Sequence, residues 1–383
     1  MPSTPKPRDI MGQPSWRLAS DRVEAFVTQI GGMLAPVTFD KDGRKLQPLS
    51  VAPWHQERLD SATPSLLAAL RGDFFCMPFG GNATPHRGER HPPHGEPANA
   101  RWQDPTLTRH GDAVSLQCRL DLHVRTGTVH KRIELRQGQD FIYQSHTIDG
   151  VRGKMPAGHH AMLAFPDRPQ AGVVSTSPFL HGQVFPGPFE NPAEGGYQAL
   201  RPGATFHTLA AVPGMTGDTE DVSRYPARDG FEDLVMLVGD PSRDWAWSAV
   251  TFARERFAWF AIKDPAVLPH TVLWLSNGGR HYPPWNGRHR RVMGIEEVAS
   301  FFHLGLAESV KANALSRDGH PTALSLRADR PTVVRYGFGV AKLPAGFDRV
   351  ERIESDDDGR GVTLIADSGK RARARIDLDA IVG

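Results

Sequence analysis

The chain has 383 residues, enough for one large domain or two ordinary ones. Hydrophobic residues make up 39% and charged residues 23%, a balance typical of a soluble globular protein. The 45 Lys and Arg against 43 Asp and Glu give a net charge of +2. The basic residues are scattered rather than striped, which argues against a nucleic-acid partner. No stretch approaches the roughly 18 apolar residues of a membrane span, so we expect no membrane association.

The N-terminus carries neither a strong folding pattern nor a targeting signal. The first fifteen residues are rich in proline, and we expect residues 1–20 to form an N-terminal arm. The start Met1–Pro7 lacks the apolar core of a secretion signal. We therefore expect a cytoplasmic protein in which Cys76 and Cys118 are free thiols.

Most of the remaining chain alternates between apolar and polar residues. Its 38 glycines and 32 prolines fall at short intervals and separate these runs from one another. Alternation with a period of two predicts half-buried antiparallel strands. The clearest runs are 23–28, 113–120, 129–135, 141–148 and a hairpin of 362–366 with 372–378 around Asp367–Lys370.

Helical periodicity is scarce. Only residues 63–70 and 302–308 show it, and both segments are short. We find neither an internal repeat nor a long linker. The sequence therefore predicts an all-β protein, in which residues 21–383 form one large antiparallel β-sandwich with few short helices.

A buried acid is the first sign of a site. Glu296 lies inside an apolar, strand-like stretch that follows a segment dense in aromatic residues and glycine. Burial of a carboxylate is costly unless it is paired or used, although most glutamates at strand ends are surface residues. Two upstream segments, 92–96 and 156–161, offer His94, His159 and His160 as partners. A glutamate facing two histidines suits general acid–base chemistry on a neutral hydroxylated substrate.

The spacing of His86, His91 and His94 also invites a metal interpretation. A loop rich in proline and glycine lacks the rigid geometry of a zinc site, and no cysteine cluster accompanies it. We therefore expect no metal ion and no other cofactor.

Four motifs then carry a resemblance. They are Pro78–Asn82 with His94-Gly95 and Trp102, Gly158–Leu163, Asp229–Val235 and Val292–Glu296. In this order they resemble the galactose mutarotase-like (aldose 1-epimerase) superfamily over residues 22–342. The resemblance implies a galactose mutarotase-like β-supersandwich and an isomerase that interconverts sugar anomers. It also implies that Glu296 is the base and His160 the acid, with His94 a hydrogen-bonding partner of the substrate.

The residues that would bind the sugar are less clear. Glu232 and Asp233 both stand where the family has a single acid that grips sugar hydroxyls. The arginine that usually follows the Pro-Phe turn is absent, and Asn82 is a candidate in its place. Residues 274–285 are expected to form a loop whose Tyr282 and Trp285 could lie flat against a sugar ring, although packing in the core is as common for such rings.

Three functions remain open on the sequence. The first is an aldose 1-epimerase that acts on a small-molecule sugar. The second is a non-catalytic carbohydrate-binding or regulatory protein on the same fold. The third is an epimerase for a phosphorylated or acidic sugar, for which Arg87, Arg90, Arg280 and Arg288 are available near the expected loops. A homodimer is compatible with each.

Overall fold

The computed structural model describes residues 2–357 and 359–383. About 46% of the chain is strand and 6% helix, and the large sheets are antiparallel, which confirms the all-β prediction. The chain divides into two compact units. Unit 1 comprises Met1–Ala161, Ala266–Pro269 and Glu297–Gly337, and unit 2 comprises Met162–Pro265, His270–Glu296 and Phe338–Gly383. Among the described residues, no helix combines the length and the hydropathy that crossing a membrane would require.

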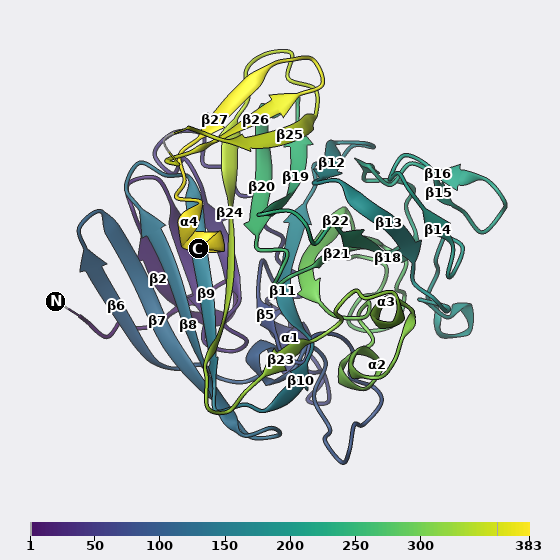
Figure 1. Cartoon of the computed structure of the whole chain (residues 1–383), viewed down its shortest axis with the longest axis horizontal. Helices are drawn as coiled ribbons and strands as arrows, with labels where there is room; N and C mark the ends of the chain where they lie inside the picture. The colour runs from purple at the N-terminus through teal and green to yellow at the C-terminus, as the bar shows by residue number, and fades with distance from the viewer. Residues whose placement is uncertain (1, 358) are drawn as a thin grey trace. The chain divides into compact units, whose positions relative to one another are not determined.

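Unit 1 is built mainly from two sets of antiparallel strands. Strands β1 to β4 form a four-stranded sheet in chain order, and β6 to β9 lie side by side in the same way (Figure 1). The strands are β1 Arg8–Ile10, β2 Gln13–Ala19, β3 Glu24–Thr28, β4 Leu34–Thr38, β5 Phe75–Cys76, β6 Gln103–His110, β7 Ala113–Leu122, β8 Gly127–Arg136, β9 Phe141–Asp149, β10 Gly153–Met155 and β23 Leu324–Leu326. The helices are α1 Ser65–Ala69, α2 Leu306–Val310 and α3 Ala314–Arg317, with a 3-10 turn at Glu96–Ala98.

The strands of unit 1 follow the sequence pattern closely. All four predicted runs between 23 and 148 lie in β3, β7, β8 and β9. Apolar side chains on one face, such as Leu116 and Ile133, are fully buried, and the two residues face each other across the β7–β8 ladder. Both predicted cysteines are free and buried, as expected. Half-buried alternation is thus enough to place these elements.

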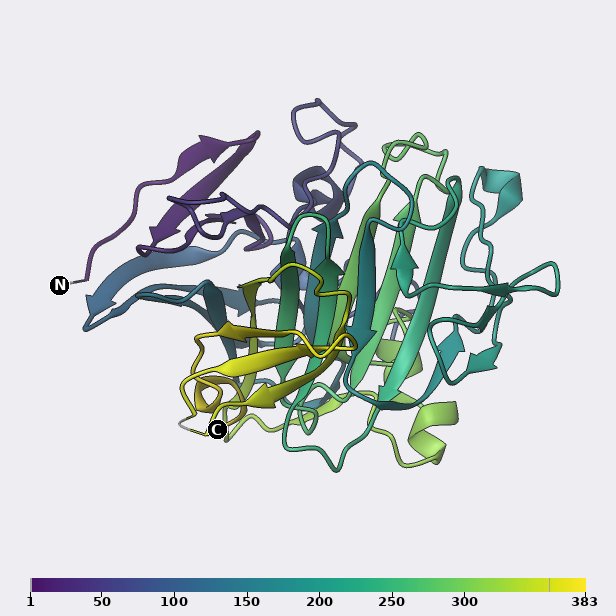
Figure 2. The same ribbon diagram turned by 90° about the horizontal axis from the view of Figure 1, so that it is seen from above.

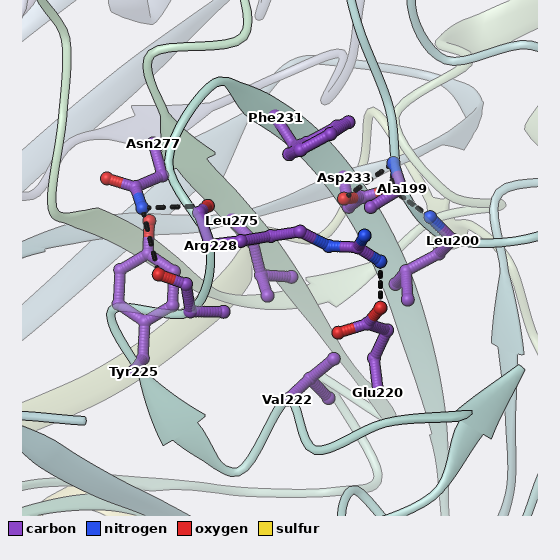
Figure 3. A pocket seen from close by; sticks show the side chains of 11 residues that line it. Ala199, Leu200, Glu220, Val222, Tyr225, Arg228, Phe231, Asp233, Leu275 and Asn277 are labelled. Carbon is purple, nitrogen blue, oxygen red and sulfur yellow. Dashed lines mark hydrogen bonds and ion pairs between the residues drawn. The ribbon is translucent and has the colours of Figure 1, made fainter. Parts of the chain in front are cut away.

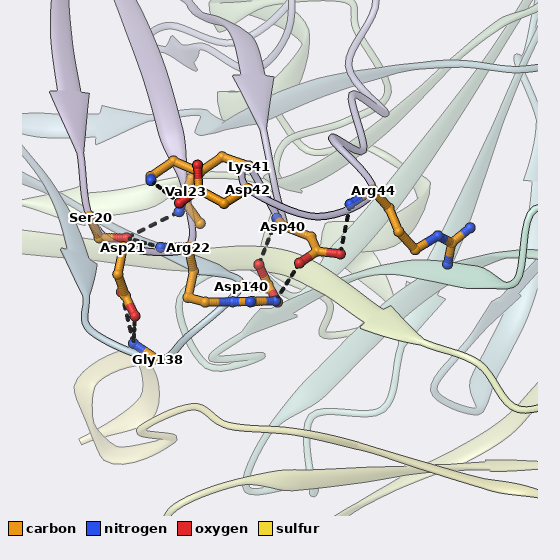
Figure 4. Close-up of polar contacts among 10 residues, drawn as sticks. All are labelled: Ser20, Asp21, Arg22, Val23, Asp40, Lys41, Asp42, Arg44, Gly138 and Asp140. Atoms are coloured by element: carbon orange, nitrogen blue, oxygen red, sulfur yellow. Dashed lines mark hydrogen bonds and ion pairs between the residues drawn. The ribbon is translucent and has the colours of Figure 1, made fainter.

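The N-terminal segment expected to be an arm contributes two strands, β1 and β2, to the four-stranded sheet. Arg22 ties the turn that follows to the rest of unit 1 (Figure 4). Its guanidinium donates to Asp40 Oδ1 at 2.8 Å and to Asp140 Oδ2 at 2.6 Å. Asp140 in turn accepts from the backbone N–H of Asp40 at 2.8 Å. The turn between β2 and β3 is therefore fixed to the turn between β8 and β9.

Unit 2 contains three larger sets of antiparallel strands and the separate pair β15-β16. One runs β17-β12-β19-β20, another runs β14-β13-β18-β21, and β25 to β27 form the three-stranded sheet drawn in yellow in Figure 2. The strands are β12 Gly172–Thr176, β13 Phe179–Val184, β14 Thr205–Phe206, β15 Val212–Pro213, β16 Thr219–Glu220, β17 Arg224–Tyr225, β18 Phe231–Gly239, β19 Ala246–Phe252, β20 Phe257–Lys263, β21 His270–Asn277, β25 Val350–Ser355, β26 Val362–Ala366 and β27 Arg371–Ala374. A 3-10 turn covers Pro192–Glu194, and α4 covers Asp379–Val382.

Three strands contain residues of both units: β11 Ala157–Ala164, β22 Val292–Ala299 and β24 Thr332–Lys342. The predicted C-terminal hairpin is confirmed by the pairing of β26 with β27. The two predicted helical segments contain α1 and the beginning of α2. The loop expected from residue 274 onward was wrong at its start, because Trp274–Asn277 end strand β21. The glycines and prolines after Asn277 favour a loop, and the prediction extended that loop too far toward the N-terminus.

Candidate functional site

In unit 1, His94 lies on a tight loop built by its neighbours. Its N–H donates to Gly80 O at 2.7 Å, and its carbonyl accepts from Met77 N at 3.2 Å. At Gly95 the backbone has a φ of +77°, and a Cβ there would stand 1.9 Å from Met77 O. Only glycine fits this close approach. The His-Gly pair therefore exists because the loop must lie directly against the Pro-Phe turn.

The structure brings His94 and His160 together, with 5.1 Å between ring centroids. Phe74 stacks on His160 at 4.7 Å, and Phe79 meets the His94 ring edge-on at 5.1 Å. His160 is held by its N–H, which donates to Phe74 O at 3.0 Å. Burial lowers the pKa of His94 to about 4, so this ring is neutral near pH 7. A neutral His94 can donate or accept a hydrogen bond, but it is not expected to act as a proton donor near pH 7.

His159 points to the opposite face of β11, as alternation along a strand requires. Its Nδ1 lies 3.0 Å from Asp73 Oδ2, which also accepts from Gln144 Nε2 at 2.6 Å. Tyr336 stacks on its ring at 4.4 Å, and both His159 and Asp73 are fully buried. His159 thus belongs to the core of unit 1, and it braces the strand that carries His160.

The side-chain amide of Asn82 makes hydrogen bonds to backbone groups through both its nitrogen and its oxygen. Its Nδ2 donates to the carbonyls of Pro78, Gly80 and Pro92, each within 3.1 Å. Its Oδ1 accepts from Leu306 N at 2.9 Å. Asn82 has a φ of +53°, a conformation that asparagine tolerates better than most residues. In this structure it shapes the loop between Pro78 and His94.

In unit 2, strand alternation separates Glu232 from Asp233. Asp233 turns toward the pocket drawn in Figure 3, where its Oδ1 accepts from Ala199 N at 3.1 Å and Leu200 N at 2.8 Å. Arg228 and Glu220 form an ion pair beside it. Burial raises the pKa of Asp233 to about 7, against the pull of these backbone donors. Asp233 therefore anchors the segment around residue 200.

Glu232 faces the other side of β18, opposite Ser276 on β21. Its Oε2 accepts from Trp274 Nε1 at 2.9 Å, and its Oε1 accepts from Ser276 Oγ at 2.9 Å. The carboxyl is fully buried, and burial raises its pKa to about 8 although Arg280 opposes the shift. The two adjacent acids thus have separate environments.

Arg280 is the cation of this part of unit 2. Its Nε donates to Glu190 Oε1 at 2.6 Å, and Tyr282 Oη donates to Glu190 Oε2 at 3.3 Å. The guanidinium lies 4.7 Å from the Trp285 ring centre and 5.3 Å from that of Trp274. Cation–π contacts of this kind hold the half-buried guanidinium in place. Trp285 and Tyr282, two predicted sugar contacts, therefore help to position Arg280.

Glu296 occupies the position that the sequence predicted, in β22 and 1% exposed. Its Oε1 lies 2.7 Å from the point where a Cβ on Gly294 would stand, beside Trp274. Glycine two residues upstream thus leaves room for the carboxylate on the same face of the strand. Burial raises the pKa of Glu296 well above its ordinary value, and Arg280 opposes that shift. The raised pKa makes this carboxylate a stronger proton acceptor than an exposed glutamate.

Sequence reasoning did not find Glu190, Ser276 and His289 as members of this cluster. Glu190 lies in a proline-rich loop without periodicity. Ser276 could have been found, since it follows Trp274 at the two-residue spacing of one strand face. Within residues 2–357 and 359–383, no group of three His, Cys, Asp or Glu side chains is arranged to hold a metal ion.

Comparison with known proteins gives the fold. No family model and no curated protein sequence matches the chain. A solved Escherichia coli K12 protein, provisionally named an aldose 1-epimerase, is 13% identical with a TM-score of 0.56, and the match covers 87% of this chain and 100% of that one. A Klebsiella pneumoniae protein with the same provisional name is 12% identical with a TM-score of 0.60, over 87% and 81% of the two chains.

A third similar structure is a galactose mutarotase related enzyme from Lactobacillus acidophilus. It is 11% identical with a TM-score of 0.52, and the match covers 85% of this chain and 97% of that one. Identities this low show the fold alone. The resemblance seen in the motifs is thereby confirmed at the level of architecture: this chain has a galactose mutarotase-like fold.

Proposed function

We propose that the protein is an aldose 1-epimerase that interconverts the anomers of a small, uncharged sugar. The observation that carries the proposal is Glu296, a buried carboxyl of raised pKa on the strand where the family resemblance puts the base. The pairing of His94 with His160 supports it, since the resemblance gives both residues to the same substrate oxygen.

The reaction requires that the hemiacetal ring opens and closes again. Glu296 takes the proton from the C1 hydroxyl while His160 donates a proton to the ring oxygen, and the C1–O5 bond breaks. Rotation about the C1–C2 bond then presents the other face of the aldehyde. Closure returns the proton from Glu296 to the oxygen on C1, and His160 recovers its proton from O5. Protons and electrons balance, and no cofactor takes part.

His94 and His160 have different roles in this mechanism. His94, with its pKa lowered to about 4, is neutral and serves as a hydrogen-bonding partner to the ring oxygen. His160 carries the transferred proton. We assign Glu232 rather than Asp233 to the sugar side, since Glu232 shares its strand face with Ser276 and Trp274 whereas Asp233 binds backbone N–H groups. Asn82, saturated by the loop, is assigned no sugar contact.

An uncharged sugar is favoured by the balance of charge in unit 2. Arg280 is the cation among this cluster of described side chains, and it already faces Glu190, Glu232 and Glu296. Arg280 already pairs with Glu190, so its guanidinium is not available to the anionic group of a phosphorylated or acidic sugar. The charge therefore argues against the acidic-sugar alternative.

Polarimetry with unphosphorylated aldoses and their 6-phosphates tests the proposal. We expect the wild-type protein to speed anomer interconversion of an unphosphorylated aldose above the buffer rate. Glu296→Gln keeps the shape and removes the base, and loss of a positioned base lowers a rate by about 10²–10⁴-fold. Sugar binding by calorimetry without any acceleration by the wild-type protein would instead identify a carbohydrate-binding protein.

A further inference from the structure

Three buried side chains of unit 2, Glu232, Ser276 and His289, form a continuous hydrogen-bonded chain. Ser276 Oγ lies 2.9 Å from Glu232 Oε1 and 2.6 Å from His289 Nδ1. Glu232 and Ser276 are fully buried, and His289 is 2% exposed. The His289 ring stacks on Trp274 at 5.3 Å with planes 12° apart, and it meets Trp285 edge-on at 5.1 Å. The aromatic rings thus fix the imidazole with Nδ1 toward Ser276.

A hydroxyl has one proton, so Ser276 cannot donate to both neighbours at once. Two arrangements satisfy the chain. When Glu232 is ionised, Ser276 donates to Glu232 Oε1 and His289 Nδ1–H donates to Ser276. When Glu232 is protonated, its O–H donates to Ser276, whose proton turns to His289 Nδ1, and the neutral ring carries its proton on Nε2. Uptake of one proton therefore reverses both hydrogen bonds and changes the tautomer of His289.

We propose that Glu232, Ser276 and His289 form a proton-coupled switch, in which the protonation of Glu232 sets the tautomer of His289 through the hydroxyl of Ser276. Ser276 and His289 are thus positioning residues for Glu232. No nucleophilic step and no bond other than O–H and N–H bonds takes part in the switch.

The charges around the switch place it in an accessible pH range. Burial, followed by the nearby Arg280, lowers the pKa of His289 to about 3, so the ring is neutral and has two tautomers to choose from. Burial raises the pKa of Glu232 to about 8, so this carboxyl changes its charge near neutral pH.

Several other ionisable groups surround Glu232. Arg280, Glu190, Tyr282 and Tyr225 act on it electrostatically, Asp233 follows it on the strand, and Glu296 shares Arg280 with it. Burial raises the pKa of Tyr282 to about 12 and that of Tyr225 well above 10, so both hydroxyls stay protonated near pH 8. Asp233, with a pKa raised to about 7, is the neighbour from which Glu232 has to be distinguished.

The switch has a consequence for the reaction, and this step rests on the proposed function. Arg280 faces both Glu232 and Glu296. When Glu232 is neutral, the guanidinium is shared with one carboxylate fewer and favours the ionised form of Glu296 more strongly. The switch would thereby tune the base that opens the sugar ring.

Nitrogen-15 NMR of the histidine rings tests the switch without any sugar, so its failure is distinguishable from failure of the proposed function. Spectra of the full-length protein are recorded across the range that brackets the Glu232 pKa of about 8, and His289→Gln identifies the His289 signals. We expect the protonated and unprotonated nitrogens of His289 to exchange character with a midpoint near pH 8. A tautomer that stays constant through the carbon-13 titration of the Glu232 carboxyl overturns the proposal.

Variants then locate the coupling. Glu232→Gln and Ser276→Ala should each abolish the pH response of His289, while the Glu232 carboxyl still titrates in Ser276→Ala. Asp233→Asn is the matched control, since it removes the adjacent carboxyl on the other strand face and should leave the response unchanged. A response that persists in Ser276→Ala, or disappears in Asp233→Asn, contradicts the switch. The wild-type titration decides the question even where a variant does not fold.

Discussion

At the scale of single residues, two glycines determine where the proposed catalytic groups can stand. Gly95 lets the His94 loop lie against Met77 O, and Gly294 leaves space for the carboxylate of Glu296. At both positions a Cβ atom would stand too close to a neighbouring oxygen, so only glycine leaves enough space. Substitution of these glycines is therefore expected to disturb the site, although neither residue takes part in the reaction.

Gly294→Ala should therefore disturb Glu296 directly. The new methyl group would stand 2.7 Å from Glu296 Oε1 and 3.2 Å from Trp274 Cβ, so the carboxylate has to move. Displacement of a catalytic group by about 1 Å can cost about 10²-fold in rate. We expect a fall of this order in anomer interconversion, measured by polarimetry. Gly187→Ala is the control, since a Cβ there meets nothing within 4 Å. Equal activity of both variants would argue against Glu296 as the base.

The two histidines should respond differently to substitution. His160→Asn removes the proposed proton donor, and we expect kcat to fall with little change in sugar affinity, because the lost interaction acts mainly in the transition state. His94→Asn should retain more activity, since asparagine can still donate a hydrogen bond and neutral His94 supplies no more. Steady-state kinetics with calorimetric sugar affinities measure the difference. A loss confined to affinity in His160→Asn would remove His160 as the acid.

At the scale of elements, two acidic side chains fasten the His94 loop to the turn between β7 and β8. Glu89 makes a two-pronged pair with Arg125, at 3.0 and 2.7 Å. Glu96 accepts from the backbone N–H groups of His123 and Val124. The loop between β5 and β6 has little regular structure, so these contacts set its position.

Arg125→Leu should loosen this loop without unfolding unit 1. The pair is partly buried, and loss of such a pair costs about 1 kcal/mol. We expect faster amide hydrogen exchange over residues 83–93, with a small change in melting temperature. Arg109→Leu on β6 is the control, since this exposed arginine forms no such pair with the loop. Unchanged exchange in Arg125→Leu would show that the other contacts of the loop suffice.

Asp233 links strand β18 to the segment around residue 200, and its titration should appear in stability. Its pKa is about 7 in the folded protein and near 3.8 in the unfolded chain. Between these values the folded state binds more protons, so its contribution to stability is present below about pH 4 and is lost as the pH rises to about 7. The loss is on the order of a few kcal/mol.

Asp233→Asn keeps an oxygen to accept from Leu200 N and removes the titration. We expect urea unfolding to show a smaller decline in stability between about pH 5 and pH 8 than in wild type, with the variant more stable at the upper end. Asp244→Asn, at an exposed site, should retain the wild-type decline. Parallel pH profiles for wild type and Asp233→Asn would contradict a raised pKa.

The sequence predicted the strands and the buried acid that leave a signal within a few consecutive residues. Alternation found β7, β8, β9 and the C-terminal hairpin, and an acid among apolar neighbours revealed that Glu296 is buried. The partners of Glu232 escaped because they depend on the register between β18 and β21, which places Ser276 opposite. Glu190 reaches Arg280 across 90 residues of sequence. A contact between residues so far apart in the sequence produces no pattern among neighbouring residues, so the sequence did not predict it.

At the scale of the whole molecule, the chain crosses between its two units repeatedly. It does so after Ala161, Pro265, Pro269, Glu296 and Gly337. Neither unit is therefore a contiguous segment, and no single cut separates them. Unit 1 needs its late residues: Tyr336 stacks on His159, and Gly158 lies so close to Glu297 O that a Cβ would stand 2.4 Å away.

This connectivity predicts that the chain, including strands β1 and β2, unfolds as a single domain. Calorimetry should show one transition whose calorimetric and van't Hoff enthalpies agree. The fragment 1–161 should not fold alone, because it lacks the residues that stack on His159 and cover Gly158, and its amide NMR spectrum should show the narrow dispersion of an unfolded chain. Scans of the intact protein at two heating rates control for irreversible unfolding. Two resolved transitions, or a well-dispersed spectrum from the fragment, would contradict the single-domain prediction, since each requires that one unit keeps its structure without the segments that the other half of the chain supplies.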